Sequence, residues 1–213
     1  GRWPAYYHDS LPGALDIGPG SPTGTTFGTD AKFPAKYQRA LFAADWTYGT
    51  LYAIHFEPDG ATFRGQNEEF LFGKPLPLTD VIVNPHDGAL YFAVGGRRTH
   101  SALYRVTYTG SESVAPAAPR PLTAEVKLRR ELQTLLDKDV GPQAIDQAWP
   151  HLGHPDRFVR FVARAAIERQ LPANWAERAL RESDPQTAIE ALTALARVGP
   201  NFYQPRLMEA LSR

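Results

Sequence analysis

Two stretches of this chain repeat one pattern, and this repeat restricts the fold more than any other feature. The first covers residues 39–56 and the second covers residues 88–108. Each has an apolar run, a turn and a second run that holds a Leu-Tyr pair, first Leu51-Tyr52 and then Leu103-Tyr104. Short runs rich in aromatic and β-branched residues, separated by glycine, are typical of paired antiparallel strands. A spacing of roughly fifty residues falls in the range of propeller blades, so the repeat predicts a β-propeller.

The apolar runs predict about two four-stranded blades. A first blade is predicted by four runs, at residues 23–27, 41–44, 51–56 and 69–72. A second blade, which lacks its fourth strand, is predicted by residues 79–83, 89–94 and 103–108. Because a propeller closes with about four to eight blades, we expect these to be the closing blades of a larger propeller. The remaining blades would then come from the same parent chain or from other chains.

A change of apolar period separates the second half of the chain from the first. Residues 158–169 carry apolar side chains at a spacing of three and four residues, which indicates one buried face of a helix. His154-Pro155-Asp156 and Ser183-Asp184-Pro185 provide residues that cap helix starts. We therefore expect a β-propeller portion followed by an all-α HEAT-like solenoid. Its parts would be an irregular segment (1–20), the blades (21–110), a Pro/Ala/Ser linker (111–121) and helical repeats (122–213).

Composition excludes several classes of partner and site. The 213 residues include 23 basic and 23 acidic residues, so the formal net charge is zero. A nucleic-acid-binding surface would show an excess of Lys and Arg, and we expect none. The chain has no Cys, which excludes disulfides and thiolate metal sites within it. We also expect no membrane span, because no apolar run is long enough to cross a bilayer.

Several motifs together resemble a known family. Ser21–Phe27, Thr79–Val81 and Asp87–Tyr91 are similar to the closing blades of the six-bladed propeller in the sorbosone/glucose dehydrogenase superfamily, whose typical members use pyrroloquinoline quinone (PQQ). With the following helical segment Trp149–Arg160, the order of parts resembles planctomycete-type membrane-bound dehydrogenases and haem-binding proteins. The resemblance covers about residues 1–200.

The resemblance implies a portion of an exported oxidoreductase, periplasmic or secreted, of the sugar or alcohol dehydrogenase type. Such an enzyme is linked to quinone or haem and passes electrons to a c-type cytochrome domain, here outside the chain. It also implies basic side chains that bind the carboxylates of PQQ, but the matching positions are Thr47, Pro77 and Thr79. The cofactor and the catalytic residues therefore stay unassigned. The alternative is a non-catalytic scaffold of propeller and solenoid that binds a protein or a glycan.

Loops that join strands at one mouth of a propeller usually carry its ligand site. This places seven residues at the candidate site, namely Asp45, Trp46, Tyr48, Thr79, Asp80, Arg97 and Arg98. One interpretation makes Trp46 a stacking platform and the two arginines anchors for an anion. The other has Trp46 packed between blades and the arginines paired with Asp45 or Asp80. No metal site is predicted, because His151 and His154 have only Asp156 near them.

Overall fold

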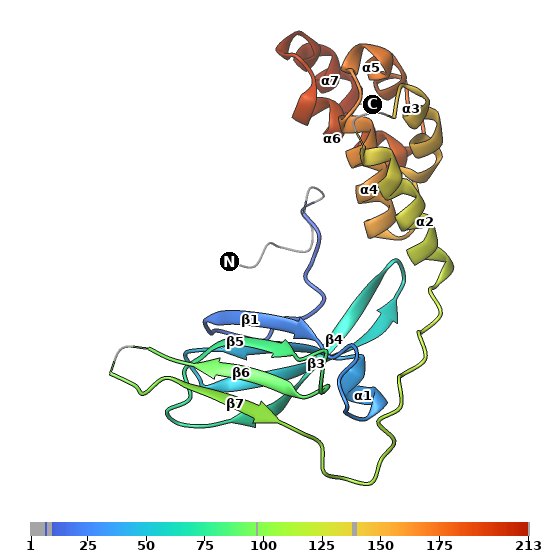
Figure 1. The fold of residues 1–213 in the computed structure, drawn as a ribbon. Helices are drawn as coiled ribbons and strands as arrows, with labels where there is room; N and C mark the ends of the chain where they lie inside the picture. The colour runs from blue at the N-terminus through green and yellow to red at the C-terminus, as the bar shows by residue number, and fades with distance from the viewer. Residues whose placement is uncertain (1–6, 8–9, 97, 138–139, 213) are drawn as a thin grey trace. The chain divides into compact units, whose positions relative to one another are not determined.

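The computed structural model describes residues 7, 10–96, 98–137 and 140–212 (Figure 1). The chain divides into two compact units, which we call the strand unit and the helical unit. The strand unit comprises Ala14–Pro58 and Phe63–Pro121. The helical unit comprises Leu122–Arg213 together with Gly1–Gly13 and Asp59–Thr62.

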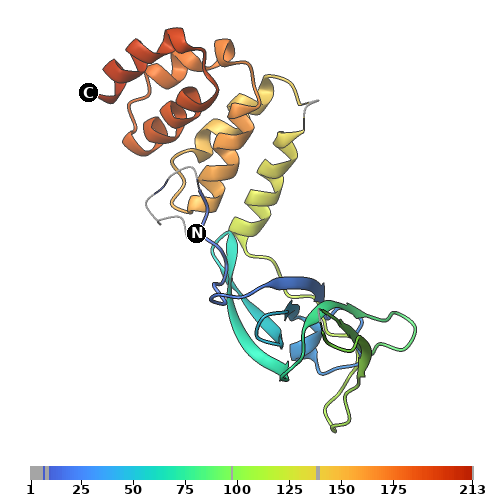
Figure 2. The same cartoon turned by 90° about the vertical axis from the view of Figure 1, so that its left-hand side faces the viewer.

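The strands form two antiparallel sheets, each in sequential order (Figures 1 and 2). The first sheet contains β1 (Pro22–Phe27), β2 (Leu41–Asp45), β3 (Thr50–Asp59) and β4 (Thr62–Phe72). A short helix, α1 (Ala35–Gln38), lies between β1 and β2 in sequence. The second sheet contains β5 (Leu78–Val83), β6 (Leu90–Val94) and β7 (Ala102–Val106). In both sheets the registers are those of neighbouring antiparallel strands, for example Leu41 opposite Ile54.

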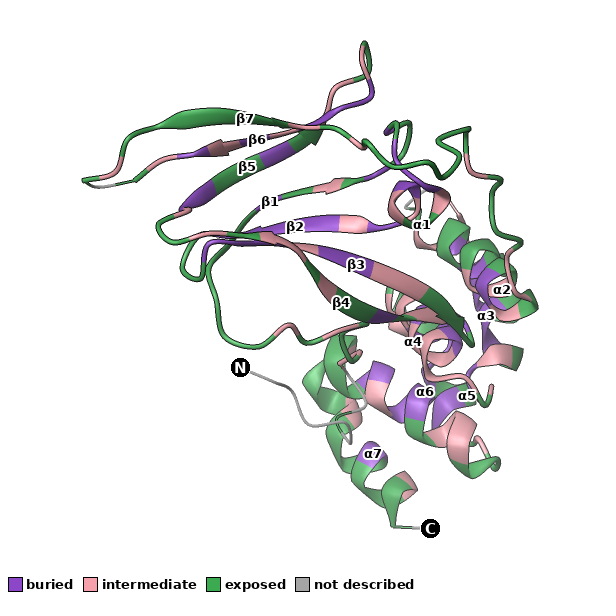
Figure 3. Cartoon of the chain, turned by 90° about the horizontal axis from the view of Figure 1, so that it is seen from below, coloured by how far each residue is buried: buried purple, intermediate pink, exposed green. Residues whose placement is uncertain are grey.

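Strands β1 and β5 approach each other closely, and one glycine permits this. A Cβ atom on Gly24 would lie 2.6 Å from the Cα atom of Asp80 and 2.8 Å from the backbone nitrogen of Val81. Apolar side chains of both sheets then share one core, in which Phe42, Leu51, Leu78 and Leu90 are fully buried. Strand β7 is mostly exposed (Figure 3).

The predicted fold class is wrong. The described part of the chain forms two open sheets of four and three strands and seven α-helices, a mixed α/β arrangement in which no ring of blades closes. A repeated hairpin pattern is local and reports only which strands pair with their neighbours. It does not report how many sheets form or whether they close around an axis, and this is why it misled the prediction.

The helical unit is not a regular solenoid either. Its helices are α2 (Ala124–Gln133), α3 (Gln143–Ala148), α4 (Arg157–Glu168), α5 (Ala176–Leu180), α6 (Pro185–Val198) and α7 (Gln204–Leu211). Their lengths vary from 5 residues in α5 to 14 residues in α6, and 3-10 turns interrupt their sequence. Matched helix pairs therefore do not recur. The buried stripe of α4, with Val159, Ala163 and Ala166 fully buried, packs into a single core.

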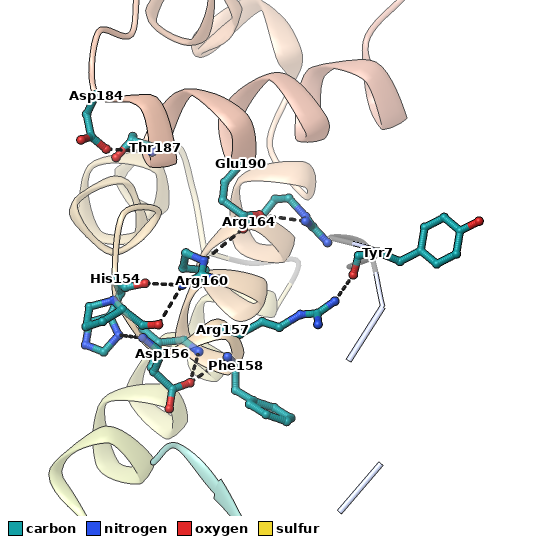
Figure 4. Close-up of polar contacts among 12 residues, drawn as sticks. Tyr7, His154, Asp156, Arg157, Phe158, Arg160, Arg164, Asp184, Thr187 and Glu190 are labelled. Carbon is teal, nitrogen blue, oxygen red and sulfur yellow. Dashed lines mark hydrogen bonds and ion pairs between the residues drawn. The ribbon is translucent and has the colours of Figure 1, made fainter. Parts of the chain in front are cut away.

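Two predicted N-cap residues, Asp156 and Asp184, are confirmed at the starts of helices. The Asp156 carboxylate accepts hydrogen bonds from the backbone nitrogens of Phe158 and Val159 at the start of α4, and Asp184 accepts one from Thr187 at the start of α6. Figure 4 shows the contacts of Asp156 with Phe158 and of Asp184 with Thr187, together with the ion pair between Arg164 of α4 and Glu190 of α6. No helix in the part of the chain that the structure describes is both long and apolar enough to span a membrane.

The Pro/Ala/Ser stretch is attached to the strand unit. The buried side chain of Gln38 donates to the carbonyl oxygen of Ala115 at 2.9 Å and accepts from the backbone nitrogen of Ala117 at 2.8 Å. Arg39 donates to the carbonyl oxygen of Ala118 at 3.1 Å. Residues 115–118 are therefore held in place by α1 and the residue that follows it.

Candidate functional site

The turn between β2 and β3 presents two aromatic side chains. Asp45, which is only 2% exposed, ends β2, and one of its carboxylate oxygens accepts hydrogen bonds from the backbone nitrogens of Thr47 at 2.7 Å and Tyr48 at 3.0 Å. Gly49 closes the turn with φ at +64°, a conformation that suits glycine. This turn leaves Trp46 43% exposed and Tyr48 47% exposed.

The indole of Trp46 is fixed to the loop between β6 and β7. Its Nε1 atom donates to the carbonyl oxygen of Gly95 at 3.0 Å. Gly96 lies against the ring, since a Cβ atom there would be 3.0 Å from Cζ2 of Trp46. The ring is therefore held at one edge while much of it remains open to solvent.

Two adjacent open cavities lie beside these aromatic residues, and we call them together the aromatic groove. The first has a volume of about 320 Å³ and is lined among others by Trp46, Tyr48, Lys74, Pro75, Leu76 and Thr99. The second has a volume of about 420 Å³ and is lined among others by Pro19, Tyr48, Tyr52, Glu69, Phe72 and Lys74. Because both share Tyr48 and Lys74, they form one strip along the surface of the strand unit.

The structure brings together some of the predicted site residues and separates others. Trp46 and Tyr48 line the aromatic groove, and Asp45 lies beneath them as the support of their turn. Thr79 donates its hydroxyl hydrogen to the carbonyl oxygen of Ala93 and does not line this groove. Asp80 lines a separate cavity of about 260 Å³ on the second sheet.

The two predicted arginines belong to the loop between β6 and β7. Arg98 adopts a positive φ of 64°, is exposed, and directly precedes the groove residue Thr99. Arg97 lies outside the described residues. Arg98 shares no hydrogen bond or ion pair with the residues that the structure describes, so the predicted pairing with Asp45 or Asp80 does not occur for this arginine.

Sequence reasoning missed the groove residues Tyr52, Phe72 and Lys74. The run Gly73-Lys74-Pro75-Leu76-Pro77 carried a usable signal, because two prolines this close exclude a regular strand and predict an extended connection. Gly73 donates its backbone N–H to the carbonyl oxygen of Gly49 at 3.0 Å and so places this connection beside the aromatic turn. That pairing is long-range and could not be read from the local pattern.

A second polar cluster is centred on Glu68 of β4. Its carboxylate accepts from Lys36 Nζ at 2.7 Å and from the Tyr37 hydroxyl at 2.8 Å, and it lies 2.9 Å from Nε2 of His55. Burial alone would raise the pKa of Glu68, but the hydrogen bonds from these three side chains outweigh it and lower the pKa to about 2. The cluster borders an open polar cavity of about 510 Å³ with Arg39 and Arg120. Because the side chains of this cluster bind one another, the cluster links α1, β3 and β4.

Metal ligands do not gather at either place. In the described ranges of the chain, no three His, Cys, Asp or Glu side chains lie close enough to hold a metal ion. His154 accepts a hydrogen bond from the backbone nitrogen of Asp156 at 3.0 Å, which gives it a role in the turn before α4. Burial, and then the nearby His154, lower the pKa of His151.

Comparisons with known proteins give no relative. No protein-family model, no curated protein and no solved structure matches this chain. The resemblance to the dehydrogenase superfamily therefore stays a prediction, and the aromatic groove has to be interpreted from its own chemistry.

Proposed function

We propose that this chain is a non-catalytic carbohydrate-binding protein and that the aromatic groove binds a polysaccharide. The observation that carries the proposal is a pair of half-exposed aromatic side chains, Trp46 and Tyr48, on a turn that Asp45 supports and beside a continuous open strip. Binding residues are concentrated on loops, and a contiguous exposed apolar patch often marks a ligand-binding groove.

The chemistry of the strip suits a sugar chain. An aromatic ring has a negative face, which attracts the slightly positive C–H groups on one face of a pyranose ring. Trp46 and Tyr48 border the first cavity, while Tyr52 and Phe72 border the second, so successive sugars could meet successive rings. Thr99 lines the same strip, and its hydroxyl, which donates to the carbonyl oxygen of Gly96 at 3.1 Å, can still accept a hydrogen bond from a sugar hydroxyl.

The oxidoreductase expectation stays a prediction without support from this groove. Its premise was a propeller, which the described sheets do not form. The positions that would anchor PQQ carry Thr47, Pro77 and Thr79, and none of these side chains is a cation. Haem or a cytochrome partner would lie outside this chain.

Affinity electrophoresis tests the proposal. The chain is run through native gels that contain neutral polysaccharides (a β-glucan, a mannan, dextran) or acidic ones, and retardation reports binding. We expect retardation by at least one polysaccharide and a loss of about fivefold or more in affinity for Trp46→Ala, because one ring contact contributes roughly 1 kcal/mol beyond its burial. Trp46→Phe keeps a ring and should retain most of the binding.

Phe202→Ala is the matched control, since Phe202 is a 70% exposed aromatic residue of the helical unit. It should bind as the unmodified chain does. The proposal is wrong if no polysaccharide retards the chain, or if Trp46→Ala and Phe202→Ala behave alike. Binding of proline-rich peptides in a Trp46-dependent manner, without polysaccharide binding, would also overturn it, because such peptides use aromatic-lined grooves as well.

A further inference from the structure

The charged residues that line the aromatic groove indicate which class of polysaccharide it would bind. The first cavity contains one charged side chain, the ammonium group of Lys74, and no carboxylate among its lining residues. Lys74 follows Phe72 by two residues and lines both cavities, so its charge lies where the two parts of the strip meet. A ligand that follows the rings from one cavity to the other has to pass this cation.

Lys74 is available to a ligand. It is exposed and forms no ion pair or hydrogen bond with any side chain that the structure describes. Lys36 shows the contrast, because its ammonium group lies 2.7 Å from the Glu68 carboxylate. The chain as a whole has equal numbers of acidic and basic residues, so an unpaired cation beside two rings does not result from a general excess of positive charge.

Neighbouring charged residues make the two cavities of the groove differ in charge. The exposed Arg98 directly precedes Thr99 in the sequence, and Thr99 lines the first cavity. Glu69 lines the second cavity and repels anions there. Opposite charges across a binding surface fix the register of a ligand more than they raise its affinity. The first cavity, with Lys74 as its one charged lining residue, therefore favours an anionic group more than the second cavity, whose lining holds both Lys74 and Glu69.

We infer that the ligand of the aromatic groove is an anionic polysaccharide, bound with an acidic group against Lys74 and its sugar rings on Trp46 and Tyr48. This inference rests on the proposed carbohydrate-binding function and specifies it. The acidic group is a carboxylate or a sulfate, which a lysine ammonium group binds in the same way as a point charge.

Two pairs of polysaccharides with the same backbone test the inference and distinguish the two acidic groups. Polygalacturonate is compared with highly methyl-esterified pectin, and dextran sulfate with dextran, by affinity electrophoresis at low ionic strength. We expect tighter binding of the charged member of at least one pair by about two- to fivefold, because an exposed ion pair contributes up to about 1 kcal/mol. In Lys74→Met, which keeps a long apolar stem, the preference should disappear while Trp46-dependent binding of the uncharged member persists.

Lys127→Met is the control for non-specific attraction to a polyanion. Lys127 is an exposed lysine of α2 that pairs with no residue in the described ranges. The variant Lys127→Met should leave the preference for the charged polysaccharide unchanged. If the chain binds charged and uncharged members equally, or if Lys74→Met keeps the preference, the inference is wrong although the carbohydrate-binding proposal stands. If no polysaccharide binds, both fail.

Discussion

At the scale of single residues, Asp45 holds the aromatic turn in shape. Its buried carboxylate accepts from two backbone nitrogens of the turn, and the backbone nitrogen of Ser21 lies 3.4 Å from the same oxygen. Gly20 packs directly against it, since a Cβ atom on Gly20 would lie within 2 Å of its other oxygen. The carboxylate therefore replaces backbone partners that a tight turn cannot provide.

Asp45→Ala should destabilise the protein and weaken polysaccharide binding together. The variant leaves the nitrogens of Thr47 and Tyr48 without their acceptor, which costs about 1–3 kcal/mol of unfolding free energy. Urea unfolding and affinity electrophoresis measure the two effects. Asp80→Ala is the control, because among the described residues the exposed Asp80 accepts a hydrogen bond only from the adjacent nitrogen of Val81, and its cost should stay below about 0.5 kcal/mol. Equal costs for both variants would contradict the role of Asp45.

The same turn shows what the sequence can predict about a site. Trp46 and Tyr48 were predicted correctly to lie on a connecting loop, because glycine and polar residues follow a strand-like run. The groove itself also needs residues 72–77, and their position depends on the long-range bond between Gly73 and Gly49. A carboxylate that supports a turn and one that binds a ligand look alike in a sequence, so Asp45 could not be distinguished from a ligand residue.

At the scale of elements, Glu68 makes the stability of the strand unit depend on pH. Its pKa in the folded protein, about 2, is lower than its ordinary value of 4.5. The ionised carboxylate therefore stabilises the fold fully above pH 4.5, and this contribution is lost as the pH falls from 4.5 through 2. Because Glu68 is about one-third exposed, solvent screens the cluster and reduces its contribution to about 1 kcal/mol.

Glu68→Gln should accordingly lower the unfolding free energy by about 1 kcal/mol at pH 7 and by progressively less as the pH falls below 4.5. Urea unfolding at pH 7, 4, 3 and 2 measures the difference between the variant and the unmodified protein. The neighbouring Glu69, which pairs with no residue that the structure describes, provides the control variant Glu69→Gln. A difference that stays constant from pH 7 to pH 2 would show that the carboxylate charge does not matter.

In the helical unit, a buried ion pair joins α4 to α6. Glu190 is 2% exposed, and its carboxylate binds Arg164 at 2.8 Å and Arg160 at 3.2 Å. Glu190→Ala removes this carboxylate from both arginines, although Arg164 keeps its pair with Glu168 at 3.2 Å, and should cost about 2 kcal/mol or more. Glu177→Ala, which breaks an exposed pair with Arg206, should cost less than about 1 kcal/mol. Thermal unfolding of both variants measures the difference, and similar melting temperatures would contradict this account.

Local elements were predicted better than their assembly. The starts of α4 and α6 follow from Asp156 and Asp184, since an aspartate before a helix satisfies free backbone nitrogens. Strand pairing followed from the hairpin pattern. The number of sheets and the irregular lengths of the helices depend instead on contacts between distant residues, such as the close approach at Gly24, and no local pattern encodes these.

At the scale of the whole molecule, each of the two units has its own hydrophobic core. The aromatic groove belongs to the strand unit alone, as every residue that lines its two cavities lies between residues 19 and 99. In the described part of the helical unit, the tryptophans Trp149 and Trp175 are 4% and 1% exposed. Ligand binding is therefore assigned to the strand unit, and we expect the ligand to make no contact with Trp149 or Trp175 of the helical unit.

The indole N–H signals of the tryptophans test this claim most directly. In a ¹H–¹⁵N spectrum, each indole gives one signal, which Trp→Phe variants assign. The Trp46 indole donates to the carbonyl oxygen of Gly95, Trp149 to the Glu182 carboxylate, and Trp175 to the carbonyl oxygen of Gln170. Upon titration with an oligosaccharide of a polysaccharide that retards the chain in the gels, we expect the Trp46 signal to shift while those of Trp149 and Trp175 stay in place. An unmoved Trp46 signal at saturating ligand, or a shift confined to Trp149 and Trp175, would contradict the account.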